Sequence, residues 1–537
     1  MDHNMKGIAA PGQWHRRRLS VFPVCAAAIV LSLLPLGCDT APPSADYRSR
    51  MQAVNASAAF DAPGKPDVSL LPTGKEWVTQ IQQDLLPYWT TPAALGNPVG
   101  NFPTFRANDG SVIDPKNLPP EVKGVDKGET WLLNRMGRQY TRTMSRQIYA
   151  FCVAYQMTGE EQYLRYAKAS IDYLYTKMVD KDGVFYTWME NGVPGPENAR
   201  QRISQDMAYA LMGPAMYYYV THDRAVLEVM LKTERYVFDH YREGNWLRWI
   251  NEEFTDLEER HLPVQKELVA QLDQINGYML ITTTVLEGKE KDQWLKDMVM
   301  LANTMKDDYY DQETNQFWGC IDRAGCKKLG EPHVDFGHTI KTLWMMLQIG
   351  QRFDVPELCA FARANMPRVF REAYSKDYNT WIEKKLENGR LGTDRIWWLH
   401  DELDQAAATL SLTDQSYVRY LIPTYRYWFF EFVDQKGKDV WHGLTGEPGK
   451  PGKPMLLKAH LWKNAFHDFE HALVGFITCQ AVRGEPIRLY YAFENQPPTA
   501  RIQPYLFAGK IGKIDTTDQV VFGNLKKVAV EFSEVRP

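Results

Sequence analysis

Between about residues 70 and 485, hydrophobic positions recur with the three-to-four-residue spacing of α-helices. The most apolar helical runs begin at steps of roughly 60 residues, which is the length of a two-helix repeat with its turns. These runs begin near Arg146, Met207, Asn276, His338, His400 and His467. Their regular spacing predicts six helices in equivalent positions.

Short polar segments, each with an aromatic residue, separate the repeats. They begin at Asp180, Arg242, Asp311, Asp377 and Asp434, and each has the composition of a hairpin turn. More amphipathic runs, such as residues 160–178 and 291–310, lie between the apolar ones. An inner ring of helices is buried on all sides and should be the more apolar ring. The pattern therefore predicts an all-α fold, an (α/α)6 toroid over residues 71–485.

This architecture gives the helix starts a common location. All six inner helices of such a toroid run in parallel, so their N-termini line one mouth. Arg146, Asn276, His338, His400 and His467 are therefore expected to converge there. Three histidines at equivalent positions of separate repeats favour a shared function over three independent structural roles.

The pattern changes near residue 486. The segments "LYYAF", "IQPYLFAG" and "VAVEFSEV" are short and β-like, and a Gly523-Asn524 turn precedes the last of them. We expect residues 486–537 to form a small β extension that packs on the toroid and carries no visible chemistry.

The N-terminus has the pattern of a targeting segment. Arg16, Arg17 and Arg18 precede an apolar run that ends in "LLPLGC" at Cys38. This predicts a bacterial lipoprotein signal over residues 1–38, followed by a flexible linker over residues 39–70 that is rich in Pro, Ala and Ser. We therefore expect an exported protein, anchored to a membrane through lipid on Cys38.

The composition limits the classes of molecule that we expect the protein to bind. The chain has 537 residues and a net charge of −4, which gives no electrostatic bias toward nucleic acid. Aromatic residues make up 12%, either as helix packing or as the lining of a carbohydrate cleft. Cys320 and Cys326 are placed for a local disulfide. Because zinc spacings, phosphate loops and serine nucleophile elbows are absent from the sequence, we predict no metal or cofactor.

Four motifs resemble the N-acylglucosamine 2-epimerase and cellobiose 2-epimerase family of sugar epimerases and isomerases. They are "SRQIYAFCVAYQMTGEEQYLRYA", "DFGHTIKTLW", "RIWWLHDE" and "LWKNAFHDFEHAL", in that order and on the right repeats. The resemblance spans roughly residues 75 to 485. It implies a mono- or oligosaccharide substrate and identifies His338 and His467 as the two catalytic residues. The residues that it implies, or that their position suggests, for substrate binding are Arg146, Asn276, Trp397, Trp398, His400, Glu402 and Trp462.

The chain departs from the family at four positions. A third pocket histidine is replaced by Leu280, and a pocket tyrosine has no secure match near Gln205. The family's glutamate three residues after the first catalytic histidine is Lys341, and its arginine three residues after the second is Glu470. We hypothesise that Lys341 and Glu470 form a cross-helix ion pair of inverted sign, the alternative being that both face solvent.

The implied chemistry explains why two histidines are needed. Epimerisation beside a carbonyl removes the C2 proton to give an enediolate and returns a proton to the other face. One base is needed on each side, with a pKa near neutrality, and imidazole meets this requirement. Arg146 would stabilise the developing oxyanion. Aldose–ketose isomerisation uses the same intermediate and stays open.

Two other readings also stay open. One is an (α/α)6 glycoside hydrolase or polysaccharide lyase, which would use a pair of carboxylates. Its candidates are Asp335, Asp401, Glu402 and Asp468. The other is a non-catalytic, carbohydrate-binding lipoprotein on the same scaffold.

Overall fold

The computed structural model describes residues 46–123, 130–180, 183–194, 202–250, 265–323 and 325–537. The predicted signal, including Cys38, and the first residues of the predicted linker lie outside these ranges. Among the described residues, no helix combines the length and the apolar composition needed to cross a membrane.

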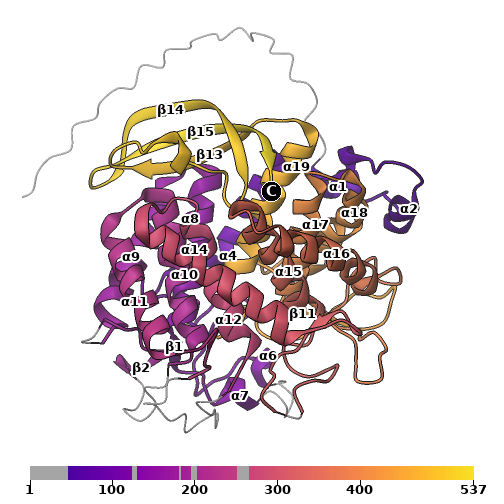
Figure 1. Ribbon diagram of the computed structural model, residues 1–537, viewed down its shortest axis with the longest axis horizontal. Helices are drawn as coiled ribbons and strands as arrows, with labels where there is room; N and C mark the ends of the chain where they lie inside the picture. Colours follow the sequence, from indigo (N-terminus) through magenta and orange to yellow (C-terminus); the bar gives the residue numbers. More distant parts are fainter. Residues whose placement is uncertain (1–45, 124–129, 181–182, 195–201, 251–264, 324) are drawn as a thin grey trace, which may run out of the picture. The chain divides into compact units, whose positions relative to one another are not determined.

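Six inner helical segments form the centre of the described fold (Figure 1). The third is continued by a π-helical turn, η5, and a short helix, α13. The segments are α8 (Thr141–Thr158), α10 (Ser204–Thr221), α12 (Leu268–Gln274) with η5 (Ile275–Met279) and α13 (Leu280–Thr282), α15 (Phe336–Arg352), α17 (Trp397–Ser411) and α19 (Phe466–Arg483).

Outer helices alternate with the inner ones along the chain. They are α3 (Gly74–Gln80) with η2 (Ile81–Leu85) and α4 (Leu86–Trp89), α9 (Glu161–Lys177), α11 (Arg224–His240), α14 (Gly288–Thr304) with η6 (Met305–Tyr309), α16 (Pro356–Ala373), and α18 (Val418–Tyr427) with η8 (Trp428–Phe432). Short helical segments are α5 (Pro92–Leu95), α6 (Pro120–Lys123), α7 (Thr130–Leu133), η7 (Gln415–Tyr417) and η9 (Thr499–Arg501).

Burial separates the two rings as the hydrophobic pattern predicts. Every residue of the inner helix α10 is buried, whereas the outer helix α11 buries one stripe. The alternation of inner and outer helices confirms the predicted (α/α)6 toroid.

The third inner helix begins earlier than the hydrophobic pattern predicts. We expected its start near Asn276, but it begins at Leu268. Its first two turns contain three polar residues that are nevertheless buried, Gln271, Asp273 and Gln274. The apolar run in the sequence therefore covers only the second half of the helix. Asn276 consequently lies about 12 Å along the helix axis from the start, at ~1.5 Å per residue.

All five polar breaks form hairpin-like pairings. Three are two-stranded sheets: β4 (Arg242–Glu243) with β5 (Trp246–Leu247), β6 (Tyr310–Asp311) with β7 (Gln316–Phe317), and β8 (Tyr374–Ser375) with β9 (Thr380–Trp381). Two are single bridges, Val179 with Phe185 and Val433 with Val440. Cys320 and Cys326 form the predicted disulfide.

Two small three-stranded sheets lie in the loops that precede inner helices. One has the order β1-β2-β3, from Arg138–Tyr140, Trp188–Glu190 and Val193–Pro194. The other has the order β10-β11-β12, from Arg395–Ile396, Gly443–Thr445 and Lys453–Pro454. β1 and β10 run directly into α8 and α17, so these sheets fix where two inner helices begin.

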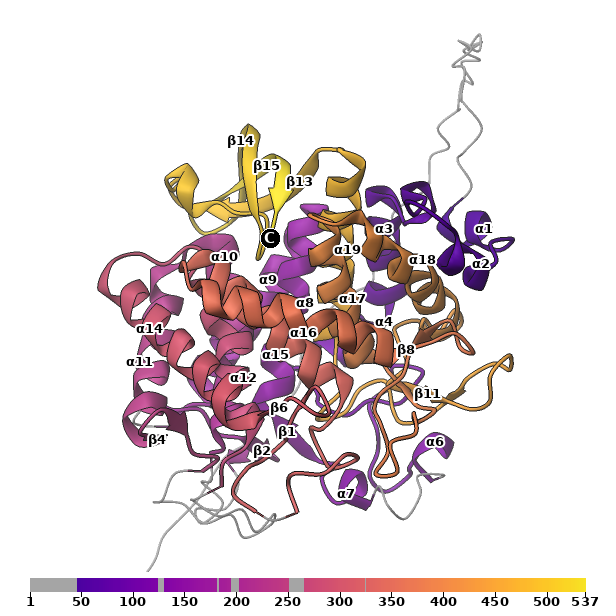
Figure 2. The same cartoon turned by 45° about the vertical axis from the view of Figure 1, so that its right-hand side comes forward.

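A larger antiparallel sheet covers the opposite end of the toroid (Figure 2). Its strand order is β13-β15-β14, from Ile487–Phe493, Leu525–Arg536 and Ala508–Phe522. Tyr155, near the end of α8, donates a 2.8 Å hydrogen bond to the Tyr491 carbonyl of β13. The sheet therefore packs on the ends of the inner helices, as we predicted for this extension.

The segment predicted as a flexible linker is helical from residue 47. Helices α1 (Tyr47–Met51) and α2 (Ala56–Asp61) and the turn η1 (Val68–Leu70) follow one another. Tyr47 and Met51 are buried, and the Tyr47 ring packs 4.6 Å from that of Phe429 in η8. Arg48 pairs with Asp84 at 2.7 Å. Tyr47 and Met51, one helical turn apart, thus hold this segment against the toroid, although its composition is that of a flexible linker.

Candidate active site

His338 is the third residue of α15 and is held by the residue that caps this helix. Asp335 is the N-cap, and its Oδ1 accepts the His338 backbone N–H at 2.7 Å. Its Oδ2 lies 2.7 Å from His338 Nδ1. Although burial acts to raise it, the adjacent His338 holds the pKa of Asp335 below its ordinary value. An ionised Asp335 fixes the proton on Nδ1 and leaves Nε2 as the basic nitrogen.

His467, the second residue of α19, also has its Nδ1 beside an aspartate side chain. Its Nδ1 lies 2.8 Å from Oδ2 of Asp401 on the neighbouring inner helix α17. Burial, with the charges of Lys341 and Arg146, lowers the pKa of His467 well below its ordinary value. The ring is therefore neutral and able to accept a proton.

Trp398 connects the two histidines. Its ring centroid lies 4.7 Å from that of His338 and 6.2 Å from that of His467. Trp397 is buried and also lies 6.2 Å from His467. The paired tryptophans of the motif thus hold both imidazoles in one site.

Arg146 enters this site from α8. Its guanidinium lies 3.9 Å from the centroid of Tyr209 and donates a 3.0 Å hydrogen bond to the Trp462 carbonyl. The Trp462 ring is 38% exposed and stacks 4.2 Å from the Arg142 guanidinium. Trp462 therefore offers a solvent-accessible aromatic face beside the two arginines.

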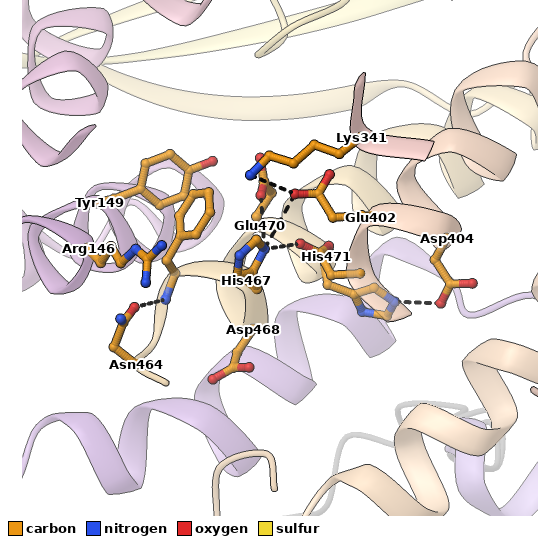
Figure 3. Close-up of polar contacts among 12 residues, drawn as sticks. Arg146, Tyr149, Lys341, Glu402, Asp404, Asn464, His467, Asp468, Glu470 and His471 are labelled. Carbon is orange, nitrogen blue, oxygen red and sulfur yellow. Dashed lines mark hydrogen bonds and ion pairs between the residues drawn. The ribbon is translucent and has the colours of Figure 1, made fainter. Parts of the chain in front are cut away.

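The two charge reversals lie in a buried network behind His467 (Figure 3). Lys341 Nζ is 3.4 Å from Glu402 and 3.3 Å from Asp273. Glu470 Oε2 is 3.7 Å from His467 Nδ1. Lys341 and Glu470 are both buried, which excludes the solvent-facing alternative.

The direct partners of Lys341 are Asp273 and Glu402, so it does not make the simple pair with Glu470 that we hypothesised. Lys341 nevertheless acts on Glu470 through space, because its charge lowers the pKa of that carboxyl group. The two substituted residues thus belong to one electrostatic cluster.

Three carboxyl groups crowd around His467 Nδ1. Burial, with the charges of Glu470 and Glu402, raises the pKa of Asp401 well above its ordinary value. Burial, with the charge of Glu402, raises the pKa of Glu470 to about 8. The cluster therefore retains protons at neutral pH, as closely spaced buried carboxyl groups must.

His400 lies outside this group, which corrects its predicted role in substrate binding. Its Nδ1 is 3.2 Å from Thr380 Oγ1, and its Nε2 is 3.2 Å from the Thr424 carbonyl. Both ring nitrogens are therefore engaged within the core, and the Asp404 carboxylate lies 3.2 Å away. The next residue, Asp401, is the one that faces His467.

Glu402 and Asn276 occupy deeper positions than the resemblance implies. Glu402 is fully buried, accepts a 2.8 Å hydrogen bond from Trp344 Nε1, and lies behind His467 at 4.0 Å. Asn276 is half-buried, and its amide nitrogen has no hydrogen-bond partner among the described residues. Asp273, three residues earlier, is the residue through which this helix pairs with Lys341.

Sequence reasoning missed Tyr209 and Asp273. Tyr209 supplies a tyrosine from the second inner helix, four residues after the position where we sought one. Asp273 accepts a 2.7 Å hydrogen bond from Gln205 as well as pairing with Lys341. Nothing in the local pattern marks either residue, because both depend on how neighbouring helices face one another.

Two groups of side chains in the described chain bring metal-ligand atoms within 4.8 Å of one another. One contains Cys320 and Cys326, whose sulfurs are joined in the disulfide. The other is Asp401, His467 and Glu470. Within this second group, His467 Nδ1 already lies 2.8 Å from Asp401 Oδ2, so the two side chains contact each other directly.

Comparisons with known proteins agree with this fold. The sequence model of the N-acylglucosamine 2-epimerase (GlcNAc 2-epimerase) family matches residues 132–456. The cellobiose 2-epimerase of Dictyoglomus turgidum is 22% identical over 341 residues, covering 60% of this chain and 83% of that relative. The solved cellobiose 2-epimerase of Spirochaeta thermophila has a TM-score of 0.61 at 17% identity, covering 76% and 97% of the two chains. A solved D-mannose isomerase has a TM-score of 0.57 at 14% identity, covering 76% and 97%.

The fold and these relatives define an (α/α)6 protein of the carbohydrate epimerase type, which places it among the isomerases. The family match covers more than half of the sequence. The chain belongs to the N-acylglucosamine 2-epimerase family, as its motifs predict.

Proposed function

We propose that the protein interconverts C2 epimers of a reducing aldose or aldose-terminated oligosaccharide through an enediolate. The observation that carries this proposal is the pair of imidazoles, each with Nδ1 within 2.8 Å of an aspartate side chain and both rings beside Trp398. The reaction needs one proton-transfer group on each face of C2, of which one takes the proton and the other returns one.

The proposed reaction begins with ring opening, which exposes the C1 carbonyl. One imidazole Nε2 removes the C2 proton, and the C–H electron pair moves into the C1–C2 bond while the carbonyl oxygen becomes an enediolate oxygen. The opposite histidine, which carries a proton on Nε2 at the start of the cycle, gives that proton to the other face of C2 as the C1 carbonyl re-forms. Proton exchange with water then returns both histidines to their starting states. Arg146 and Lys341 bring positive charge to the site, which stabilises the intermediate.

Two features argue against the carboxylate-based alternatives. Asp335 and Asp401 are the carboxylates closest to the histidines, and each is committed to an imidazole Nδ1. Asp468 lies behind the site, bonded to the buried Lys463 at 2.5 Å. None of the three is presented as a solvent-facing acid or base.

The test is to incubate the purified protein with cellobiose, N-acetylglucosamine, glucose and mannose and identify products by NMR. A C2 epimer supports the proposal. A ketose would assign the same enediolate to isomerisation, for which the D-mannose isomerase relative provides a precedent. Recovery of unchanged sugars, or cleavage of the disaccharide, would refute it.

We also propose that the protein is exported and anchored through lipid on Cys38. The charged and apolar pattern before this cysteine supports the proposal, as does the Cys320–Cys326 disulfide, which suits an oxidising compartment. Metabolic labelling with an alkyne fatty acid should mark the wild-type protein and not Cys38→Ser. Equal labelling of both would contradict the anchor.

A further inference from the structure

The connector between β13 and β14, residues 494–507, packs against three inner helices. Tyr219 of α10 donates to the Gln503 carbonyl, and Arg352 at the end of α15 donates to the Leu506 carbonyl. Tyr149 of α8 contacts Tyr505, as described below. The C-terminal sheet thus sends one segment toward the active site from the end opposite the helix starts.

Tyr505 has the most constrained position in this connector. Its side chain is buried, and its backbone adopts φ 61°, in the left-handed region that tyrosine rarely occupies. Its N–H donates a 2.6 Å hydrogen bond to the Tyr219 hydroxyl. A strained residue that its surroundings hold in place is a reason to look for a function.

The Tyr505 hydroxyl connects directly to the buried carboxyl cluster. It donates to Glu470 Oε1 at 2.6 Å and accepts from the Tyr149 hydroxyl at 2.7 Å. The other oxygen of Glu470 lies 3.7 Å from His467 Nδ1. A chain of polar contacts therefore runs from Tyr149 through Tyr505 and Glu470 to the proposed catalytic base.

We propose that Tyr505 is a positioning residue that holds the Glu470 carboxylate beside His467 and thereby makes the C-terminal sheet part of the catalytic unit. The proposal rests on the proposed function, in which His467 becomes an imidazolium when it takes the C2 proton. That charge is formed in a buried site, where the nearest carboxyl groups are Asp401 at 2.8 Å and Glu470 at 3.7 Å. Ionisation of Glu470 would supply a counter-charge beside it.

The charge of Glu470 is set by groups on every element packed around it. They are His467 on its own helix, Asp401 and Glu402 on α17, Lys341 on α15, Tyr149 on α8, and Tyr505. Burial and Glu402 favour the protonated form, whereas the Tyr505 hydroxyl and Lys341 favour the ionised form. Because Tyr505 donates its hydrogen bond, its removal should make Glu470 harder to ionise.

The decisive comparison is Tyr505→Phe against Tyr491→Phe in the full chain. Tyr491 donates its buried hydroxyl to the Gln503 carbonyl at 2.6 Å, so its variant removes a hydrogen bond of the same connector and leaves the Tyr505–Glu470 hydrogen bond in place. Tyr505→Phe should shift the limb of the kcat profile that follows Glu470 upward by about one to two pH units. KM should stay within about twofold of the wild-type value, since Tyr505 does not reach the substrate. Tyr491→Phe should leave the profile in place.

An infrared titration tests the same contact without any activity. The band of the protonated Glu470 carboxyl is assigned by its loss in Glu470→Gln, and it should persist to higher pH in Tyr505→Phe than in the wild type. If the band shifts but the wild-type protein epimerises no sugar, the positioning role of Tyr505 is supported and only the proposed function is refuted. An unshifted band, or equal changes in the two tyrosine variants, would overturn the positioning role.

Tyr149→Phe provides a second variant in case Tyr505→Phe does not fold. It removes the donor to Tyr505 and keeps the Tyr505–Glu470 hydrogen bond, so it should shift the band in the same direction by a smaller amount. No shift in Tyr149→Phe would count against the chain of contacts.

Discussion

Asp335 does two things at one helix terminus: it caps α15 and it orients the His338 ring. Replacement of Asp335 by Asn keeps a carbonyl oxygen that can accept the His338 backbone N–H. It replaces the oxygen beside His338 Nδ1 with an amide nitrogen, which donates a hydrogen bond instead of accepting one. The amide would favour the His338 tautomer with the proton on Nε2, which removes its basic nitrogen. We expect kcat for Asp335→Asn to fall about 10²-fold to 10⁴-fold, in line with the loss of a general base.

Asp335→Ala separates this effect from helix capping. It should lose activity to a similar extent and also lose about 1 kcal/mol of unfolding free energy, because the cap is gone. Urea denaturation and steady-state kinetics on both variants measure the two effects. An Asn variant with wild-type kcat would mean that Asp335 serves the helix alone.

Trp462 should contribute to substrate binding more than to stability. Its ring is 38% exposed, and its contact with Arg146 is made by the backbone carbonyl, which a side-chain substitution preserves. For Trp462→Ala we expect KM to rise about tenfold, which corresponds to ~1.4 kcal/mol of lost binding. Val520→Ala, at a 48% exposed position on β14, is the control that should leave KM unchanged. An unchanged KM in Trp462→Ala would remove this residue from the binding surface.

His338 and His467 lie in the first turns of inner helices, as their spacing predicts, and both rings lie beside Trp398. The direction of the His400 side chain was not predictable, since one residue of helix turns the side chain by about 100°. That rotation sends His400 into the core and Asp401 to His467. Sequence spacing finds the helix, but a single-residue difference in register decides which side chain reaches the site.

At the scale of elements, α1 shows that a polar composition can conceal a docked helix. Tyr47 packs on Phe429 with its hydroxyl buried and without a hydrogen-bond partner among the described residues. Tyr47→Ala should therefore cost about 3–5 kcal/mol of local stability, by analogy with other large-to-small aromatic replacements. Tyr47→Phe should be close to neutral, because it removes an unsatisfied polar atom.

Limited proteolysis measures this difference directly. Cleavage in the residues around α1 should be faster in Tyr47→Ala than in the wild type, and Tyr47→Phe should behave like the wild type. Equal cleavage rates in all three would restore the flexible linker that the composition suggests.

The helical repeat itself was predictable because it is a local pattern that recurs along the chain. The third inner helix shows the limit of this signal. Gln271, Asp273 and Gln274 interrupt its apolar run, yet all three are buried because strand β5 and helix α10 supply their hydrogen-bond partners. Polar residues that are satisfied through distant contacts cannot be distinguished in sequence from residues that face solvent.

The molecule as a whole should become less stable as the pH rises from about 6.5 to about 8. Burial raises the pKa of both Glu470 and Glu234 to about 8. Such groups bind protons in the folded state that they lose in the unfolded state, so the unfolding free energy falls until the pH exceeds the folded pKa. Below pH 6.5, the depressed pKa of His467 has the opposite effect on the unfolding free energy. The unfolded chain then binds a proton on this histidine that the folded protein does not bind, so the unfolding free energy falls as the pH is lowered.

Two variants separate the contributions to this pH dependence of stability. Glu470→Gln tests the contribution of the site, and Glu234→Gln tests that of the outer helix α11. Each should flatten the pH dependence of the urea midpoint between pH 6.5 and 8, and only Glu470→Gln should alter the pH profile of activity. A pH dependence that survives in the double variant would place its source elsewhere.

The contribution of the C-terminal sheet is the feature that the sequence conceals most completely. Its strands are visible as alternating residues, but Tyr505 meets Glu470 across 35 positions of chain and Tyr149 across 356. Neither contact belongs to a repeat. Only the folded toroid shows that this extension reaches the buried carboxyl groups behind His467.

The central claim is that two histidines exchange the C2 proton of a sugar, and isotope exchange tests it most directly. The protein is incubated with an accepted aldose in deuterium oxide, and deuterium at C2 is followed by NMR. We predict incorporation at C2 by the wild-type protein and its loss in both His338→Ala and His467→Ala, with His400→Ala retaining exchange if it remains folded. Sugar conversion without deuterium at C2, or undiminished exchange in the His338→Ala and His467→Ala double variant, would contradict the account.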